Sequence, residues 1–210
     1  ALVGVLNEIK TEAENGKFLI EDSFEDMHSK IEFILTQKLG DLGKKIHTAR
    51  SRNDQVLVSI HLYLKKEISE IKSLINDFFK LLISLAKKNK DKLLPGYTHF
   101  QVAMPSSFGL WFSAYAESLI DDVTLFNAVK KIVDQNPLGS AAGFGSSFPI
   151  NRETTTKALD FGDLKYNVIA AQMSRGKAEK LISNAIACLS ATLAKMAYDI
   201  CLYMGQDHNF

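Results

Sequence analysis

The sequence predicts an all-α fold built from unusually long helices. Apolar residues recur at spacings of three and four over long stretches, which is the period of a helix. Only four prolines occur, at positions 95, 105, 137 and 149, so long proline-free tracts lie on both sides of the middle of the chain. No stretch shows a convincing alternation of apolar and polar residues, which is the pattern of a half-buried strand. The 210 residues are enough for one large domain or one and a half small ones.

Two of the expected helices lie in the first 90 residues. A shorter one is expected over about 21–39, and its apolar side consists of Phe24, Met27, Ile31, Ile34 and Leu35. A long one follows the polar stretch 47–55, with Asp54 as a plausible N-cap. Its apolar stripe consists of Ile60, Leu64, Ile68, Ile71, Ile75, Phe78, Leu82 and Leu85.

Two more long helices are expected in the second half of the chain. The first has Pro105 near its first turn. Its stripe consists of Phe108, Phe112, Tyr115, Leu119, Val123, Phe126, Val129 and Val133. The stripe of the last helix consists of Ala178, Ile182, Ala185, Leu189, Leu193, Met196 and Ile200. Residues 150–175 are less periodic, and we expect a short helix near 152–160 there.

The length of these helices predicts a bundle completed by other subunits. A helix of about 30 residues is about 45 Å long at 1.5 Å per residue. A globular domain of this size is only about 35 Å across. Leu110, Trp111 and Leu125 also lie off the main stripe of their helix, so that helix is expected to be buried on more than one face. We therefore predict an elongated long-helix bundle that assembles with further copies.

Composition excludes several classes of partner. The net charge of +1 gives no reason to expect binding to nucleic acid or to an anionic membrane surface. No apolar run approaches the roughly 20 residues that span a bilayer, and no signal peptide is recognisable. Cys188 and Cys201 lie within apolar helical pattern, so we expect two core thiols in a reducing, cytoplasmic compartment.

The stretch 47–55 is the strongest candidate for a binding site. It places eight polar or charged side chains in nine positions directly before a long helix. A helix N-terminus offers free backbone N–H groups and the positive end of the dipole, and arginine matches a carboxylate with a planar fork. We therefore predict that Ser51, Arg52 and Asn53 bind a carboxylate. The alternative is a solvated connection whose charges pair with one another.

A second candidate is the pair Thr98 and His99. The histidine follows a Gly-Tyr turn and has Thr98 and Gln101 as polar neighbours. Histidine titrates near neutral pH and can transfer protons. The alternative is a structural or simply exposed histidine. The other histidines show no metal-ligand spacing, so we predict no metal; these are His28, His47, His61 and His208.

The glycine-rich run 136–149 is not a phosphate loop, because the Gly-x-x-x-x-Gly-Lys-Ser/Thr pattern is missing and no strand precedes it. We interpret it mainly as a tight connection in which small residues let backbones approach. Gly139 and Ser140 are the two positions that could still line a pocket.

Several of these segments resemble the argininosuccinate lyase family of the fumarase/aspartase superfamily. The family's His-Thr-Gly-Arg-Ser-Arg-Asn-Asp-Gln-Val stretch stands here at 47–56, with Ala49 in place of glycine. Its Gly-Tyr-Thr-His-Leu-Gln segment stands at 96–101, with Phe100 in place of leucine. Shorter matches are Glu25-Asp26-Met27-His28, Pro-Leu-Gly-Ser at 137–140, and Phe-Pro-Ile-Asp-Arg-Glu at 148–153 with Asn151 in place of aspartate. The likeness runs from about residue 16 to the end, and the Arg-Ser-Arg-Asn-Asp-Gln string is quite specific to this branch.

The resemblance implies a carbon–nitrogen lyase of arginine biosynthesis. The family's reaction eliminates fumarate from argininosuccinate and leaves arginine, without a cofactor. By this likeness Asn53 and Thr98 contact the substrate, with Ser51 and Arg52 beside them, and His99 matches the active-site histidine. Family members are homotetramers whose active sites draw segments from three subunits, and the type of fold is a long-helix bundle.

The resemblance also implies a division of the chain. Residues 1–53 correspond to a remnant of an N-terminal helical domain, and residues 54–210 to an incomplete central bundle domain. The family's substrate-binding N-terminal segment is mostly absent, and its mobile serine loop comes later than residue 210. Residues 145–149 resemble only the opening of that loop. We therefore expect the 210-residue chain alone to be inactive.

Two alternatives remain open at this stage. One is another lyase of the same superfamily, such as one that acts on adenylosuccinate, although the Arg-Ser-Arg-Asn-Asp-Gln string argues against it. The other is a structural protein without activity, as the lens delta-crystallins of this fold can be. A purely structural helical scaffold has no need for polar Thr-His and Arg-Ser-Arg-Asn segments in loops at helix ends.

Overall fold

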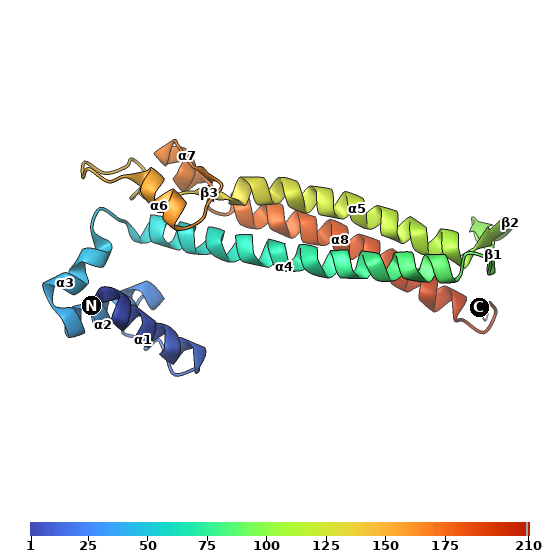
Figure 1. Cartoon of the computed structure of the whole chain (residues 1–210), viewed down its shortest axis with the longest axis horizontal. Coiled ribbons are helices and arrows are strands. Elements are labelled where there is room, and N and C mark those ends of the chain that lie inside the picture. The colour runs from blue at the N-terminus through green and yellow to red at the C-terminus, as the bar shows by residue number, and fades with distance from the viewer. Residues whose placement is uncertain (209) are drawn as a thin grey trace. The chain divides into compact units, whose positions relative to one another are not determined.

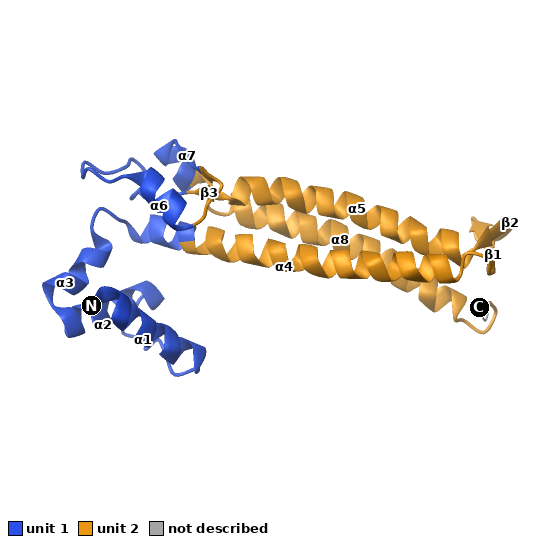
Figure 2. Cartoon of the chain, in the orientation of Figure 1, with its two compact units in different colours: residues 1–58, 137–159, 164–172 blue, residues 59–136, 160–163, 173–210 orange. Residues whose placement is uncertain are grey.

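The computed structural model describes residues 1–208 and 210 (Figure 1). The chain divides into two compact units that interleave along the sequence (Figure 2). The first unit consists of residues 1–58, 137–159 and 164–172, and the second of residues 59–136, 160–163 and 173–210. The predicted boundary between residues 53 and 54 stays a prediction.

Three long helices form the second unit almost entirely. They are α4 (Arg52–Lys88), α5 (Phe108–Val133) and α8 (Lys177–Tyr203), which lie side by side in Figure 1. Their apolar stripes meet in one core, as the spacing predicts. The members of this core that are less than 2% exposed are Ile68, Leu82, Ala116, Leu119, Phe126, Val133 and Ala185. The all-α long-helix fold expected from the sequence is confirmed.

A short hairpin between α4 and α5 was not predicted. Strands β1 (Leu93–Thr98) and β2 (Gln101–Ser107) pair antiparallel. His99 (φ 53°) and Phe100 (φ 61°) form the two-residue turn, and positive φ at both positions is the pattern of a type I′ hairpin. The strands lack alternation because almost all of β2 is exposed, so no apolar face marks them in the sequence.

The expected position of Pro105 is wrong, because this proline lies within β2 rather than in the first turn of a helix. Helix α5 begins at Phe108, and the Ser107 hydroxyl caps it by accepting a hydrogen bond from the Leu110 N–H at 3.1 Å. Two strands of two residues each, β3 (Gln135–Asn136) and β4 (Asp163–Leu164), pair to form a second small sheet.

The first unit consists of shorter helices. They are α1 (Leu2–Glu14), α2 (Met27–Leu39), α3 (Asp41–Lys44), a 3₁₀ turn (Lys45–His47), α6 (Arg152–Ala158) and α7 (Val168–Met173). Helix α1 was not predicted, and α6 confirms the short helix expected near 152–160. Helix α2 begins later than expected, because the Asp26 carboxylate accepts a hydrogen bond from the Ser29 N–H and caps it at that point. A small core of Val5, Ile9 and Leu35 joins α1 to α2.

The prediction of two core cysteines is wrong for this chain, because Cys188 and Cys201 are both exposed. The apolar pattern around them belongs to α8, whose apolar residues extend beyond the face that packs in the bundle. Helix α8 is also long and apolar enough, by length and composition, to cross a membrane, although the sequence analysis found no such run. The core helices of many soluble proteins also meet this criterion of length and composition. Only 11% of its most apolar window is buried within the chain, so much apolar surface remains uncovered.

The bundle core gives the first testable prediction. Phe126 is fully buried among the three long helices. We expect Phe126→Ala to lower the free energy of unfolding by about 3–5 kcal/mol, because it removes apolar contacts and leaves a cavity. Denaturant titration at one fixed protein concentration measures this change. The control is Lys66→Ala on the exposed side of α4, for which we expect a change within about 0.5 kcal/mol. Equal effects of the two substitutions would contradict the core assignment.

Candidate functional site

The start of α4 is fixed by a reciprocal pair of hydrogen bonds. The Ser51 hydroxyl accepts from the Asn53 N–H at 3.2 Å, and the Asp54 Oδ1 accepts from the Ser51 N–H at 2.9 Å. This is a capping box, in which two otherwise unpaired donors are satisfied. Asp54 therefore lies inside the first turn, and Ser51 takes the capping position that the sequence analysis gave to Asp54.

The second oxygen of Asp54 joins α4 to the glycine-rich run. Its Oδ2 accepts hydrogen bonds from the N–H groups of Gly139, at 3.0 Å, and Ala141, at 3.1 Å. The Asp54 side chain is completely buried. A buried carboxylate is stable only when its oxygens are fully hydrogen-bonded, and here three backbone donors do this. The carboxylate fixes the loop 137–141 against the start of the helix.

Arg152 holds the same loop from its other side. Its guanidinium donates to the carbonyl oxygens of Leu138 at 2.9 Å, Lys165 at 2.8 Å and Tyr166 at 3.1 Å. Burial lowers the pKa of Arg152, and the negative charge of Asp54 opposes this shift. Gly139 packs directly on this side chain, since a Cβ there would lie 2.8 Å from the Arg152 Cγ, and its φ of +86° favours glycine as well.

The interpretation of the glycine-rich run as a tight connection is confirmed by these contacts. Gln172 adds to them by donating from its Nε2 to the Ser140 hydroxyl and to the Ala141 carbonyl oxygen, both at 2.8 Å. Ser140 is fully buried, so its side chain supports the loop. Gly139, in contrast, lines a hollow on the surface of this unit.

The three predicted binding residues of the first unit differ in their surroundings. Arg52 is already paired: its guanidinium contacts the Asp26 carboxylate, the Ser29 hydroxyl at 3.0 Å, and Glu32 at 3.8 Å. The pKa of Asp26 is lowered, since hydrogen bonds from Ser29 and the charge of Arg52 outweigh burial, the largest single effect, which raises it. Asn53 is exposed at the start of α4, and Ser51 is half-buried beside it.

The second pair of predicted residues lies at the turn of the hairpin in the second unit. Thr98 ends β1, and His99 is the first residue of the turn. Both side chains are exposed, and so is Phe100, which is 86% exposed. The type I′ turn thus places His99 at the exposed tip of the hairpin. Their roles in binding and catalysis stay predictions.

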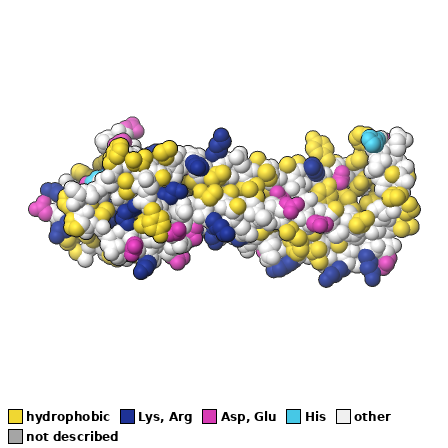
Figure 3. All heavy atoms as spheres, turned by 90° about the horizontal axis from the view of Figure 1, so that it is seen from above, with side chains coloured by type: hydrophobic (Ala, Val, Ile, Leu, Met, Phe, Trp, Pro, Cys, Tyr) yellow, Lys and Arg dark blue, Asp and Glu magenta, His cyan; other side chains and the backbone are white. Residues whose placement is uncertain are grey.

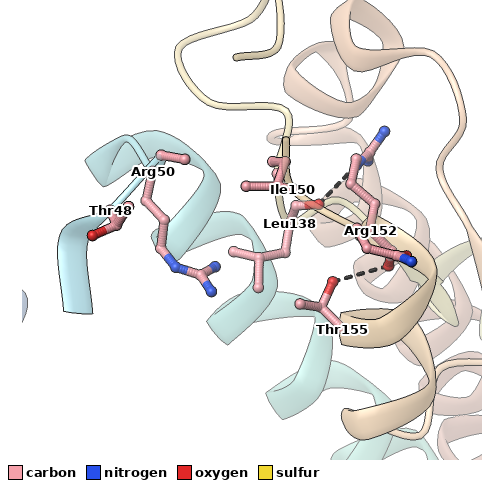
Figure 4. A pocket seen from close by; sticks show the side chains of 9 residues that line it. Thr48, Arg50, Leu138, Ile150, Arg152 and Thr155 are labelled. Atoms are coloured by element: carbon pink, nitrogen blue, oxygen red, sulfur yellow. Dashed lines mark hydrogen bonds between the residues drawn. The ribbon is translucent and has the colours of Figure 1, made fainter. Parts of the chain in front are cut away.

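Sequence reasoning missed Arg50, although it lies in the most informative stretch. This residue lines a hollow of about 190 Å³ in the first unit (Figure 4). The hollow is lined by Thr48, Ala49, Arg50, Leu138, Gly139, Ile150, Asn151, Arg152 and Thr155. Ala49 has φ 57°, so the backbone here takes the left-handed conformation that favours glycine. The family's glycine at this place was the signal for a sharp turn that orients Arg50.

No group of three or more His, Cys, Asp or Glu side chains with metal-binding geometry occurs among the described residues. His61, one of the scattered histidines, is buried inside the bundle. Its Nδ1 lies 2.9 Å from the Val133 carbonyl oxygen and 3.1 Å from that of Gln135, which is a structural role at the end of α5.

Comparison with known proteins identifies the class to which this fold belongs. The fold of this chain is shared with several lyases of known structure. An EDDS lyase in complex with formate superposes with a TM-score of 0.88 at 22% identity, over 99% of this chain and 40% of that one. A fumarate lyase from Mesorhizobium sp. BNC1 gives 0.71 at 19% identity, over 96% of this chain and 53% of that one. At these identities the likeness shows the fold alone.

The sequence comparison is more specific. A family model described as "Lyase" matches residues 1–210, and the chain belongs to that lyase family. Among its relatives, the argininosuccinate lyase of Parabacteroides distasonis is 54% identical over 209 residues, which is all of this chain and 47% of the relative. That of Stenotrophomonas maltophilia (strain K279a) is 41% identical over 212 residues, which is all of this chain and 49% of the relative. The resemblance expected from the motifs is confirmed, and the chain spans about half the length of the curated relatives it matches.

The Asp54 carboxylate gives the second prediction. We expect Asp54→Ala to lower the free energy of unfolding by about 3 kcal/mol or more, because the buried N–H group of Gly139 and the partly buried N–H groups of Ser51 and Ala141 lose their acceptor. Denaturant titration again measures the change. Asp77→Ala is the matched control on the same helix, where the carboxylate is 68% exposed and its pair with Lys80 contributes little. A cost below about 1 kcal/mol for Asp54→Ala would mean that these bonds do not hold the loop.

Proposed function

We propose that the protein acts as an argininosuccinate lyase, which cleaves argininosuccinate to fumarate and arginine. The observation that carries this proposal is the 54% identity to the argininosuccinate lyase of Parabacteroides distasonis over the whole chain. The chain also carries the Arg-Ser-Arg-Asn-Asp-Gln string at 50–55 and the Gly-Tyr-Thr-His segment at 96–99, on which the resemblance to the argininosuccinate lyase family rests. Related structures with bound formate and fumarate, both of EDDS lyase, are compatible with carboxylate binding in this fold.

The proposed reaction is an elimination. A base removes the proton from the carbon next to a carboxylate, the electron pair of that C–H bond forms the C=C bond of fumarate, and the C–N bond breaks. The guanidino nitrogen leaves with the bonding pair and takes up a proton to give arginine. Negative charge builds on the carboxylate beside the reacting carbon, so preorganised donors there stabilise the transition state.

Ser51 and Asn53 are suited to supply such donors. Their hydroxyl and amide groups lie at the first turn of α4, which the buried Asp54 carboxylate holds in place. Arg52 contributes positive charge close by while it is paired to Asp26. Thr98 and His99 are proposed to reach the same substrate, with the imidazole transferring a proton or orienting the substrate.

Such a site requires more than one copy of the chain. Residues 51–53 precede α4 and residues 98–99 follow it, and α4 is 37 residues long. A helix of this length is about 55 Å long at 1.5 Å per residue. Its two ends cannot reach one small substrate, so we propose that the segments come from different protomers of a homotetramer.

The surface of the long-helix bundle supports such an assembly. An apolar groove of about 480 Å³ runs along the second unit, and its lining is almost free of polar atoms. Hydrophobic side chains are visible among the charged ones on the face in Figure 3. Exposed apolar surface of this extent is typical of a protein interface. Residues that line the groove are Ile71, Leu74, Ile75, Phe78, Leu119, Ile186, Leu189 and Leu193.

The remaining parts of the proposal follow from the relatives' name. An argininosuccinate lyase serves arginine biosynthesis, and we propose that the protein works in the cytoplasm without metal or cofactor. Activity toward adenylosuccinate, or no activity at all as in a delta-crystallin-like structural protein, are the alternatives that the following experiment separates.

The third prediction concerns the substrate. We expect the full-length protein expressed from its native gene to release fumarate from argininosuccinate, measured by ultraviolet absorbance, and to leave adenylosuccinate intact. Turnover of adenylosuccinate only, or of neither substrate by a folded full-length protein, would overturn the proposal.

The fourth prediction concerns His99. Since its φ is positive, asparagine is the replacement that tolerates the backbone while removing the imidazole. We expect His99→Asn in the full-length protein to lower kcat by about 100-fold or more, the usual size of a general acid–base contribution, with the oligomer intact by light scattering. The control is Phe100→Asn at the next position of the same turn, where kcat should stay within a few-fold of the parent. A near-normal rate for His99→Asn would remove His99 from the mechanism.

A further inference from the structure

The Asp199 carboxylate joins α8 to α5 at the end of the bundle that carries the hairpin (Figure 1). Its Oδ2 accepts hydrogen bonds from the Trp111 Nε1–H at 2.9 Å and from the Tyr115 hydroxyl at 2.6 Å. The two donors are four positions apart on α5, so they lie on one face of that helix. Burial and the hydrogen bond to Asp199 raise the pKa of Tyr115, so its hydroxyl remains a donor at neutral pH. A single carboxylate therefore holds two aromatic side chains of α5 against α8.

Aromatic rings continue from this carboxylate to the hairpin. Tyr203 follows Asp199 by one turn of α8, and its ring centroid lies 5.9 Å from that of Trp111 and 6.4 Å from that of Tyr97 in β1. The Tyr97 ring also meets that of His208 edge-on, with the centroids 5.4 Å apart. Favourable aromatic pairs have centroids roughly 4.5–7 Å apart. The half-buried Tyr97 ring thus attaches β1 to the end of α8.

The hairpin has little other support near its turn. Residues 98–105 are all exposed, so Tyr97 is the half-buried residue of β1 closest to the turn. Leu94 is buried, but it lies at the base of the strand, five positions before His99. A two-stranded hairpin without further packing is only marginally stable in water. The direction of the turn therefore depends on what holds the Tyr97 ring.

We propose that Asp199 is a positioning residue for the hairpin turn. By holding two aromatic side chains of α5, it keeps the Tyr203 ring in place against Tyr97, and Tyr97 sets the direction of the turn that carries His99. Asp199 acts through these rings and not by contact with a substrate. The catalytic consequence rests on the proposed function, because it requires His99 to act on argininosuccinate. The anchoring of the hairpin rests only on the contacts within the bundle.

Hydrogen–deuterium exchange of the full-length protein, read by mass spectrometry, tests the anchoring. We expect Asp199→Ala to speed exchange in peptides covering 93–107 by about 10-fold, the usual effect of losing a hydrogen bond to a charged group. Peptides from residues 60–80 of α4 should exchange as in the parent. Asp199→Asn keeps an acceptor oxygen and should recover part of the loss. Tyr115→Phe removes only the hydroxyl and should speed exchange by a smaller factor.

Turnover of argininosuccinate by the same proteins tests the catalytic consequence. We expect Asp199→Ala to lower kcat by about 10- to 100-fold, because a displacement of about 1 Å at a catalytic group can cost this much. KM should change less than kcat, because residues 51–53 still bind the substrate. Asp199→Asn should again lie between Asp199→Ala and the parent.

Two control variants separate positioning from a general loss of stability. Tyr198→Phe also removes a hydroxyl, next to Asp199, but from a side chain that is 79% exposed. Ile68→Ala removes a fully buried side chain of α4, about 30 Å from the hairpin end of that helix at 1.5 Å per residue. It should lower the midpoint of denaturation but leave hairpin exchange and kcat as in the parent. An equal loss of kcat in Ile68→Ala and Asp199→Ala would show a merely structural role and overturn the inference.

The remaining outcomes separate this inference from the proposed function. Parent-like exchange at 93–107 in both Asp199→Ala and Tyr115→Phe would overturn the anchoring, whatever turnover shows. Faster exchange with a parent-like kcat would overturn the positioning role and leave the function standing. Faster exchange in a protein whose parent does not turn over argininosuccinate would reject the function and leave the anchoring standing. Circular dichroism checks folding, and if Asp199→Ala does not fold, Tyr115→Phe decides by the same criteria.

Discussion

The buried carboxylate of Asp54 is the contact on which the arrangement of the first unit depends. One of its oxygens closes the capping box with Ser51, and the other accepts from Gly139 and Ala141, which are 85 and 87 residues away along the chain. Charge-assisted hydrogen bonds of this kind are stronger and shorter than neutral ones. A single side chain thus sets where α4 begins and where the glycine-rich loop lies beside it. This contact also positions two nearby features. One is the hollow that Arg50 lines, and the other is Asn53, which is exposed.

The long helices were predictable from the sequence, because each buries a stripe that repeats every three or four residues. Each long helix contributes residues of its predicted stripe to the core. Examples are Ile68 of α4, Phe126 of α5 and Ala185 of α8. The hairpin at 93–107 was not predictable in the same way, since its second strand has no buried face and its turn contains neither asparagine nor glycine. The exposure of Cys188 and Cys201 shows a related limit. The apolar pattern of a helix shows which of its surfaces need to be buried. It does not show which of these surfaces pack within the chain and which pack against another copy.

The candidate site was predictable only in part, and the reason is the pairing of charges. Composition marks 47–55 as a cluster of polar groups, yet it does not show that Arg52 pairs with Asp26, while Arg50 has no such partner among the residues that the structure describes. The two arginines are two positions apart, and the direction of each depends on the turn at Ala49 and on the cap at Ser51. Asp26 belongs to the Glu25-Asp26-Met27-His28 match, so the family pattern already contained the partner of Arg52 without stating the pair. Contacts between distant segments of this kind follow from the fold and not from local sequence.

The central claim is that the start of α4 in one protomer and the hairpin turn of another bind one dicarboxylate. A crystal structure of the full-length oligomer with fumarate tests it most directly. The account predicts density for fumarate with donors of residues 51–53 from one protomer and Thr98 or His99 from a neighbour within hydrogen-bonding distance, about 3 Å. An oligomer in which no pair of protomers brings these segments to a common ligand would contradict it.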